Sequence, residues 1–96
     1  MRTIREEPAA QRAVDAASDR WTAADEAWNV VTWVIARDPT VGQPLREGGK
    51  ARSFTVQGVR SADLPTVTVL YEIEPNEIVI HNALFEEAEA FQAGRA

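Results

Sequence analysis

Three basic side chains and one histidine are the residues of this 96-residue chain best suited to do chemistry. Lys50, Arg52 and Arg60 lie close together in the sequence, and His81 follows further along the chain. Lysine and arginine bind phosphate and stabilise the negative charge that develops in a transition state, and histidine can act as a general acid or base. These residue types could therefore bind a phosphate group and transfer a proton.

Each of these residues also has a structural interpretation. The basic residues could lie on a solvated loop, and the sequence leaves that interpretation and phosphate binding equally open. Lys50 and Arg52 are two positions apart, so they would share one face if a strand already runs through both. For His81 the sequence favours a neutral side chain, hydrogen-bonded at a sheet edge, over a catalytic role.

Composition and context disfavour other kinds of site. The chain has no cysteine and a single histidine, so it forms no disulfide and is a poor zinc ligand. Gly48 and Gly49 stand outside the strand-to-helix context of a phosphate-binding loop. Ser18, Ser53 and Ser61 lack the context of a nucleophile elbow. We therefore expect no metal and no other cofactor.

The net charge of −5 argues against a chain that binds nucleic acid non-specifically with its whole surface. The charge is unevenly distributed, with a local charge of +3 over residues 45–61 and of −5 from Glu72 to the C-terminus. Such asymmetry is usually a property of solvated surface. The basic segment is nevertheless the best candidate for a phosphate site.

Residues 64–85 contain the strongest secondary-structure signal. Apolar residues alternate along two runs, and the Pro75–Asn76 pair separates them. Proline fixes its own φ and asparagine tolerates a left-handed conformation, so the segment predicts a β-hairpin. Leu70 and Val79 make both faces apolar, which indicates a central position in a sheet or a helix packed over one face.

Two segments, residues 8–21 and 22–37, have apolar residues at helical spacing. Pro8 suits the first turn of the first helix. The Asp38–Pro39 pair ends the second helix, because the residue before a proline avoids the helical conformation. We expect two antiparallel helices rather than one long kinked helix, since packing both on the sheet buries all three tryptophans at least in part.

The remaining segments connect or extend these elements. Residues 38–51 and 58–65 are expected to be loops, and residues 52–57 alternate like a half-buried strand. Residues 85–91 have the spacing of a short C-terminal helix. Residues 1–7 are either disordered or a short edge strand.

The predicted fold class is α+β, in a single domain over residues 1–96. It consists of an antiparallel sheet of three to four strands, two N-terminal helices packed on that sheet and a short C-terminal helix. The sequence has no apolar run of the length that spans a membrane, and its first residues lack the features of a signal peptide. A cytoplasmic protein is therefore expected.

The segment from Val30 to Leu84 resembles the RelE/ParE superfamily of toxin–antitoxin toxins. The resemblance begins with a helix that ends in ARDPTVGQPLREGG, and continues with ARSFTV and TVTVLYEIEPNEIVIHNAL. The positions that match the family pattern are Asp38, Pro39, Gly42, Pro44, Leu45, Tyr71, Ile73, Ile78 and Ile80. The resemblance covers a little over half of the chain and implies a RelE/ParE-like domain.

The resemblance implies a bacterial toxin that an antitoxin protein neutralises. One branch of the family cleaves messenger RNA on the ribosome, with basic residues that activate the ribose 2′-hydroxyl and stabilise the phosphorane. The other branch poisons DNA gyrase. Lys50 and Arg52 lie where the ribonuclease branch keeps basic groups, and Arg60 lies near the position of its arginine. His81 is a more distant candidate for acid–base work.

Two positions depart from the ribonuclease pattern. Glu86 follows the last strand where those members carry an arginine, and Phe91 stands in place of the tail tyrosine. An acidic tail weakens phosphate binding. We therefore expect a toxin-family protein that has diverged from ribosome-dependent mRNA cleavage or acts by protein–protein interaction. The alternative is a non-enzymatic interaction module with the same fold and no toxin activity, and the tryptophan-bearing helices could also form a homodimer.

Overall fold

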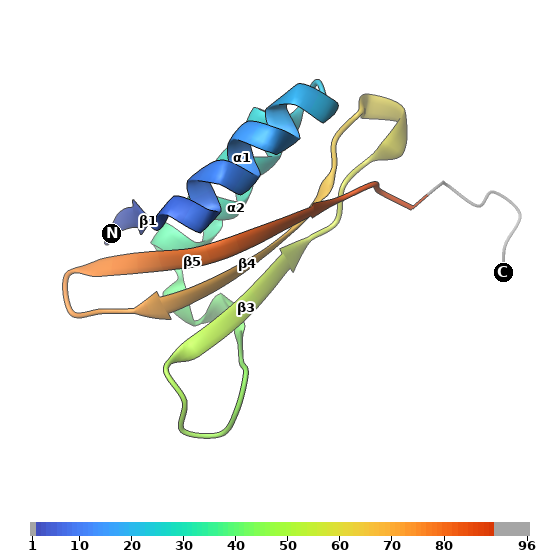
Figure 1. Cartoon of the computed structure of the whole chain (residues 1–96). Helices are drawn as coiled ribbons and strands as arrows, with labels where there is room; N and C mark the ends of the chain where they lie inside the picture. The colour runs from blue at the N-terminus through green and yellow to red at the C-terminus, as the bar shows by residue number, and fades with distance from the viewer. Residues whose placement is uncertain (1, 90–96) are drawn as a thin grey trace, which may run out of the picture.

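Two helices pack on one face of a mixed β-sheet in the computed structural model, which describes residues 2–89 (Figure 1). The helices are α1 (Pro8–Arg20) and α2 (Ala24–Arg37). The strands are β1 (Thr3–Glu6), β2 (Gln43–Pro44), β3 (Ala51–Val56), β4 (Thr66–Ile73) and β5 (Glu77–Glu86). Short 3-10 helices, Pro39–Val41 and Arg60–Ala62, lie in the two long loops. The predicted α+β architecture with two N-terminal helices on a sheet is confirmed.

The sheet has five strands in the order β1-β5-β4-β3-β2, and its β1–β5 pair is parallel. The prediction of three to four antiparallel strands is therefore wrong in number, and wrong in direction for the β1–β5 pair, whereas the other three pairs are antiparallel as predicted. β1 is the short edge strand that the sequence allowed at the N-terminus. β2 is a two-residue strand within a segment expected to be a loop, and it is too short for alternation to reveal it.

The β4–β5 hairpin lies at the centre of the sheet, as predicted. The backbone N–H of Glu74 donates to the carbonyl of Glu77 at 2.8 Å and closes the turn that contains Pro75 and Asn76. On the side that faces the helices, Tyr71 and Ile80 are fully buried. The hairpin therefore supplies much of the core.

A β-bulge at His81 shifts the alternation of β5. The register passes from the pair Tyr71–Ile80 to the pair Leu70–Asn82, so His81 is the extra residue of the bulge. As a result, Ile80 and Ala83 both pack in the core although they are three positions apart. A strand with this irregularity no longer shows a continuous period of two.

The predicted C-terminal helix over residues 85–91 is wrong where the structure describes it. Phe85 and Glu86 are the last residues of β5 and pair with the start of β4. Residues 87–89 follow without regular secondary structure, and residues 90–91 lie outside the described residues. The first half of β4 offers backbone partners that favour a continued strand, a tertiary effect that outweighs local spacing.

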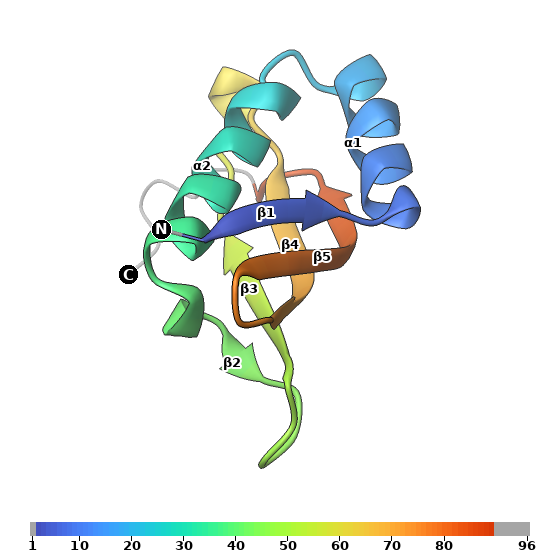
Figure 2. The ribbon, with the colours of Figure 1, turned by 90° about the vertical axis from the view of Figure 1, so that its left-hand side faces the viewer.

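The helix pair buries two of the tryptophans and exposes the third. Figure 2 shows α1 and α2 side by side over the same face of the sheet. Trp21 and Trp28 are buried, and the Trp28 ring lies beside Phe85 of β5 with 5.9 Å between the ring centroids. Trp33 is 58% exposed. The expectation of buried tryptophans is thus confirmed for Trp21 and Trp28, and Trp33 lies on the surface.

Candidate functional site

The face of the sheet opposite α1 and α2 is covered by no described helix, and we call it the open face (Figure 1). Its side chains alternate along β3, β4 and β5 with those that pack in the core: Ser53, Thr55, Thr68, Leu70, Glu72, Val79, His81, Asn82 and Leu84. Most of these side chains are polar, as expected for an antiparallel sheet with one solvated face. A ligand or partner can approach the sheet from this side.

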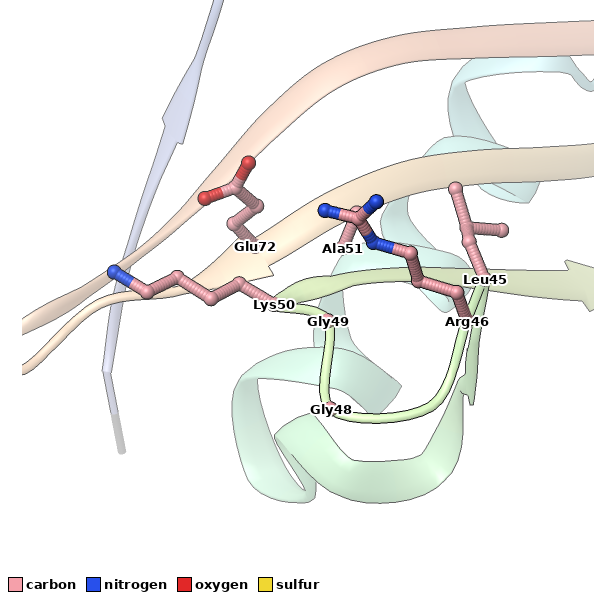
Figure 3. A pocket seen from close by; sticks show the side chains of 7 residues that line it. All are labelled: Leu45, Arg46, Gly48, Gly49, Lys50, Ala51 and Glu72. Atoms are coloured by element: carbon pink, nitrogen blue, oxygen red, sulfur yellow. The ribbon is translucent and has the colours of Figure 1, made fainter.

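A hollow of about 590 Å³ lies at the end of the open face, beside the connection from β2 to β3. It is lined by Leu45, Arg46, Gly48, Gly49, Lys50, Ala51 and Glu72 (Figure 3). The side chains of Arg46 and Lys50 lie on either side of Glu72 in this view. Lys50, a predicted site residue, therefore belongs to this hollow.

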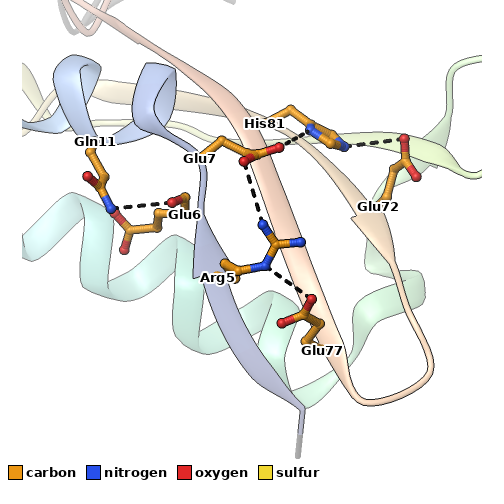
Figure 4. Close-up of polar contacts among 7 residues, drawn as sticks. All are labelled: Arg5, Glu6, Glu7, Gln11, Glu72, Glu77 and His81. Carbon is orange, nitrogen blue, oxygen red and sulfur yellow. Dashed lines mark hydrogen bonds and ion pairs between the residues drawn. The ribbon is translucent and has the colours of Figure 1, made fainter.

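Glu72 also belongs to a charged group that we call the His81 cluster: Arg5, Glu7, Glu72, Glu77 and His81 (Figure 4). His81 Nδ1 lies 3.4 Å from Glu7 Oε1, and His81 Nε2 lies 3.2 Å from Glu72 Oε1. Arg5 Nη1 lies 3.6 Å from Glu7 Oε2, and Arg5 Nε lies 3.1 Å from Glu77 Oε1. The bulge directs the imidazole between two carboxylates, a common use of such irregularities.

The His81 cluster is net negative whether or not the histidine is protonated, because three carboxylates face one guanidinium and one imidazole. Val79 is buried between its register partners Arg5 and Glu72. A histidine between two carboxylates can bind and release a proton. A negative surface repels the phosphates of RNA. The cluster therefore suits proton transfer or a cationic partner group better than an RNA backbone.

Arg52 lies on the opposite face of the sheet from the hollow. β3 begins at Ala51, so the alternation that would place Lys50 and Arg52 on one face does not extend to Lys50. Arg52 Nη1 donates a hydrogen bond to the carbonyl of Gly42 at 2.7 Å and a longer one to that of Thr40 at 3.4 Å. The guanidinium thus holds the loop after α2 against the sheet.

Tyr71 completes this attachment, which we call the loop clamp (Pro39, Gly42, Arg52 and Tyr71). The Tyr71 hydroxyl donates to the carbonyl of Pro39 at 2.6 Å and accepts from the N–H of Gly42 at 3.0 Å. Burial raises the pKa of Tyr71 above its ordinary value. A Cβ on Gly42 would lie 2.5 Å from the Tyr71 oxygen, so the close approach requires glycine. Sequence reasoning missed this contact, because the loop and Tyr71 are far apart in the sequence.

Arg60 lies at the other end of the sheet. It begins the 3-10 helix that precedes β4, whereas Lys50 and Glu72 lie beside the end of β4. Arg60 Nε lies 4.0 Å from Glu87 Oε1, and Arg20 Nη2 lies 3.7 Å from Glu87 Oε2. Arg60 is therefore part of a surface ion-pair group that most of the length of β4 separates from Lys50.

The structure thus brings both Lys50 and His81 beside Glu72 and separates Arg52 and Arg60 from them. Sequence reasoning did not identify Glu72 or Glu7 as members of the site. Glu72 had a weak signal, as a charged position in the predicted hairpin. Glu7 had none, because the parallel β1–β5 pairing that brings it to His81 joins distant segments.

Within residues 2–89, no group of three or more His, Cys, Asp or Glu side chains is arranged to hold a metal ion. In the same part of the chain, no helix is both long and apolar enough to cross a membrane.

The fold and the site define an α+β protein with a polar, uncovered sheet face that carries a hollow and a charged cluster. No model of a known protein family matches the chain, and no similar sequence is found among curated proteins.

Proposed function

We propose that this chain is a RelE/ParE-like toxin of a bacterial toxin–antitoxin system, diverged from RNA cleavage, that acts by binding a target protein. The observation that carries the proposal is the separation of the basic residues that RNA cleavage would use. Arg52 is bound to main-chain carbonyls in the loop clamp, and Arg60 lies at the other end of the sheet. Cleavage of a phosphodiester needs cations that converge on one phosphate.

The order of the elements supports the family part of the proposal. From α2 onward, a helix, a loop and the three strands β3, β4 and β5 follow one another in the order that the resemblance implies. Three matched positions, Pro39, Gly42 and Tyr71, form one structural unit in the loop clamp. The Tyr71 hydroxyl joins the main chain of Pro39 and Gly42, and the close approach leaves no room for a Cβ at position 42, so the pairing of Tyr71 with Gly42 has a physical reason.

The composition of the open face favours a protein partner over RNA. The carboxylates of the His81 cluster are only balanced by Arg5 and by Arg46 and Lys50 beside Glu72, so this face lacks the excess of cations that an RNA backbone needs. Leu84 on the open face is 54% exposed and Leu45 at the hollow is 57% exposed, so both offer apolar contacts to a protein chain. We expect an antitoxin-type protein and a cytoplasmic target such as DNA gyrase as partners, and no cofactor.

Inducible expression of the chain in bacteria tests the proposal. We expect growth arrest with intact messenger RNA, and an arrest that the open-face variants Lys50→Ala and His81→Ala weaken without any change in messenger RNA. Assays of ribosome-bound mRNA and of DNA supercoiling by gyrase would identify the affected process. Lys50→Ala is a better probe than Arg52→Ala, because removal of Arg52 also weakens the loop clamp.

Ribosome-dependent mRNA cleavage by Lys50 and His81 is a second candidate function. It is favoured by one observation, the position of both side chains beside Glu72. Messenger RNA cleavage that Lys50→Ala and His81→Ala abolish would replace our proposal with this candidate, provided that Arg12→Ala on the exposed surface of α1 cleaves normally. Normal growth with a folded, soluble protein would instead support the interaction module without toxin activity.

A further inference from the structure

The surface of α2 that faces away from the sheet carries a stripe of exposed residues that the proposed function does not use. The stripe consists of Glu26, Asn29, Val30, Trp33 and Arg37, whose spacing places them on one side of a helix. Val30 is 44% exposed and Trp33 is 58% exposed. We call this surface the Trp33 stripe.

The Trp33 stripe has the features of a binding surface. Shallow hollows of about 690 Å³ and about 450 Å³ are both lined in part by Trp33 and Asn29. A tryptophan that projects between two hollows offers a large apolar area and a place for a partner side chain on each side. Exposed aromatic groups of this kind are typical centres of protein interfaces.

The two ends of the stripe carry opposite charges. Glu26 lies in the first turn of α2 and Arg37 in the last. They are roughly 16 Å apart along the helix axis, so they cannot pair within one chain. Among residues 2–89 neither one forms an ion pair, and the Arg37 guanidinium lies over the Trp33 ring at 4.7 Å from its centroid.

We propose that the Trp33 stripe binds a second copy of the chain, with α2 antiparallel to α2 of the partner across a two-fold axis. An axis beside the middle of the stripe places Glu26 of each copy opposite Arg37 of the other. The same operation places Val30 of each copy against Trp33 of the other. The surface is therefore self-complementary in charge and in apolar contacts, which a two-fold interface requires.

The homodimer is independent of the proposed target-binding function. The Trp33 stripe belongs to α2, and α2 lies on the side of the sheet opposite the open face (Figure 1). Each copy in the dimer keeps its open face accessible. A failure of the dimer would leave the proposed function untouched, and an absence of toxicity would leave the dimer untouched.

Sedimentation equilibrium of the full chain over a range of concentrations tests the dimer. A helix pair buries less area than a standard interface, so we expect a weak dimer, roughly micromolar or weaker. Trp33→Ala should raise the dissociation constant at least about tenfold. Leu84→Ala is the matched control, because Leu84 is similarly exposed, at 54%, on the open face, and it should leave the dimer unchanged. A chain that stays monomeric at its highest soluble concentration would overturn the proposal, as would a dimer that Trp33→Ala does not weaken.

Charge reversal tests the antiparallel direction. Glu26→Arg and Arg37→Glu each convert both end contacts into repulsive ones, so each variant alone should weaken the dimer about fivefold. An equimolar mixture of the two variants should recover a heterodimer, because every end contact is then between opposite charges. Parallel helices would place Glu26 against Glu26, and a single reversal would then not weaken the dimer. Unweakened single variants, or a mixture without heterodimer, would overturn the antiparallel pairing.

Discussion

Tyr71 and Glu72 are adjacent on β4, but their side chains lie in opposite environments. The Tyr71 hydroxyl is buried on the helix side, where Pro39 and Gly42 satisfy both its donor and its acceptor function. Glu72 points to the open face, where it contacts His81 and lines the hollow. A change on the helix side should therefore alter the stability of the fold, and a change on the open face should alter binding.

The same comparison separates two cations that are close in the sequence. Arg52 lies opposite Tyr71 in the strand register and binds the loop after α2. Lys50 precedes β3 and lines the hollow with Glu72. The sheet thus separates two basic residues that are close in the sequence. Arg52 stabilises the fold on the helix side, and Lys50 lies on the open face. Proximity in sequence is weak support for a shared site when a strand begins between the two residues.

The largest effect that we expect is from Tyr71→Phe. The substitution removes the partner of the buried N–H of Gly42 and of the partly buried carbonyl of Pro39, and it should lower the free energy of unfolding by about 2 kcal/mol. Chemical denaturation measures this change. Glu72→Gln, at the adjacent position on the open face, is the control and should stay within about 0.5 kcal/mol of wild type. Equal losses of unfolding free energy in the two variants would contradict the difference between the helix side and the open face of the sheet.

Local patterns predicted the elements that depend on short-range spacing. The β4–β5 hairpin could be predicted because the Pro75–Asn76 turn separates two runs in which apolar residues alternate. The helices could be predicted because their buried residues recur at helical spacing. The end of β5 could not be predicted from the sequence. The bulge at His81 interrupts the alternation of the strand, and residues 85–91 have the spacing of a helix.

The candidate site was less predictable, because its contacts join distant segments. His81 meets Glu7 through the parallel pairing of the first and last strands, for which no local pattern exists. The orientation of Arg52 depends on where β3 begins, and element boundaries are poorly determined by sequence. The role of Tyr71 depends on a loop that lies far from it in the sequence. Only the tertiary structure supplies these contacts.

A smaller effect should separate Arg52 from Lys50. Arg52→Ala removes a charged donor from the carbonyl of Gly42, and it should lower the free energy of unfolding by about 1 kcal/mol, since the site is only partly buried. Lys50→Ala should change it by less than about 0.5 kcal/mol. Thermal or chemical denaturation of both variants under one set of conditions makes the comparison. If Lys50→Ala lowered the free energy of unfolding as much as Arg52→Ala, both residues would be shown to stabilise the fold.

The smallest effect that we expect is a pH dependence of the free energy of unfolding that comes from the burial of Tyr71. This dependence arises only above the ordinary pKa of tyrosine, so measurements at neutral pH do not reveal it. The pKa of Tyr71 is raised in the folded chain from the ordinary value of 10.0, chiefly by burial of the phenol. The unfolded chain loses this proton near the ordinary value, and the folded chain loses it only at higher pH. Between the two values the unfolded state binds fewer protons, so the free energy of unfolding falls as the pH rises. Below the ordinary pKa the phenol is protonated in both the folded and the unfolded chain. There the stabilisation is fully present, and the free energy of unfolding no longer changes with pH through Tyr71.

The chain offers a clean measurement of this titration, because Tyr71 is its only tyrosine. Ultraviolet absorbance of the folded chain should show phenolate formation later than in the chain unfolded by denaturant. Denaturation at neutral pH and at about one unit above the ordinary tyrosine value should show a loss of stability in wild type that is smaller in Tyr71→Phe. The Phe variant keeps every other group that titrates in this range, so the difference belongs to Tyr71. A phenol that titrates at the same pH in the folded and unfolded chains would show that the helix side of β4 is as accessible to water as the open face, and the comparison between the two faces would then fail.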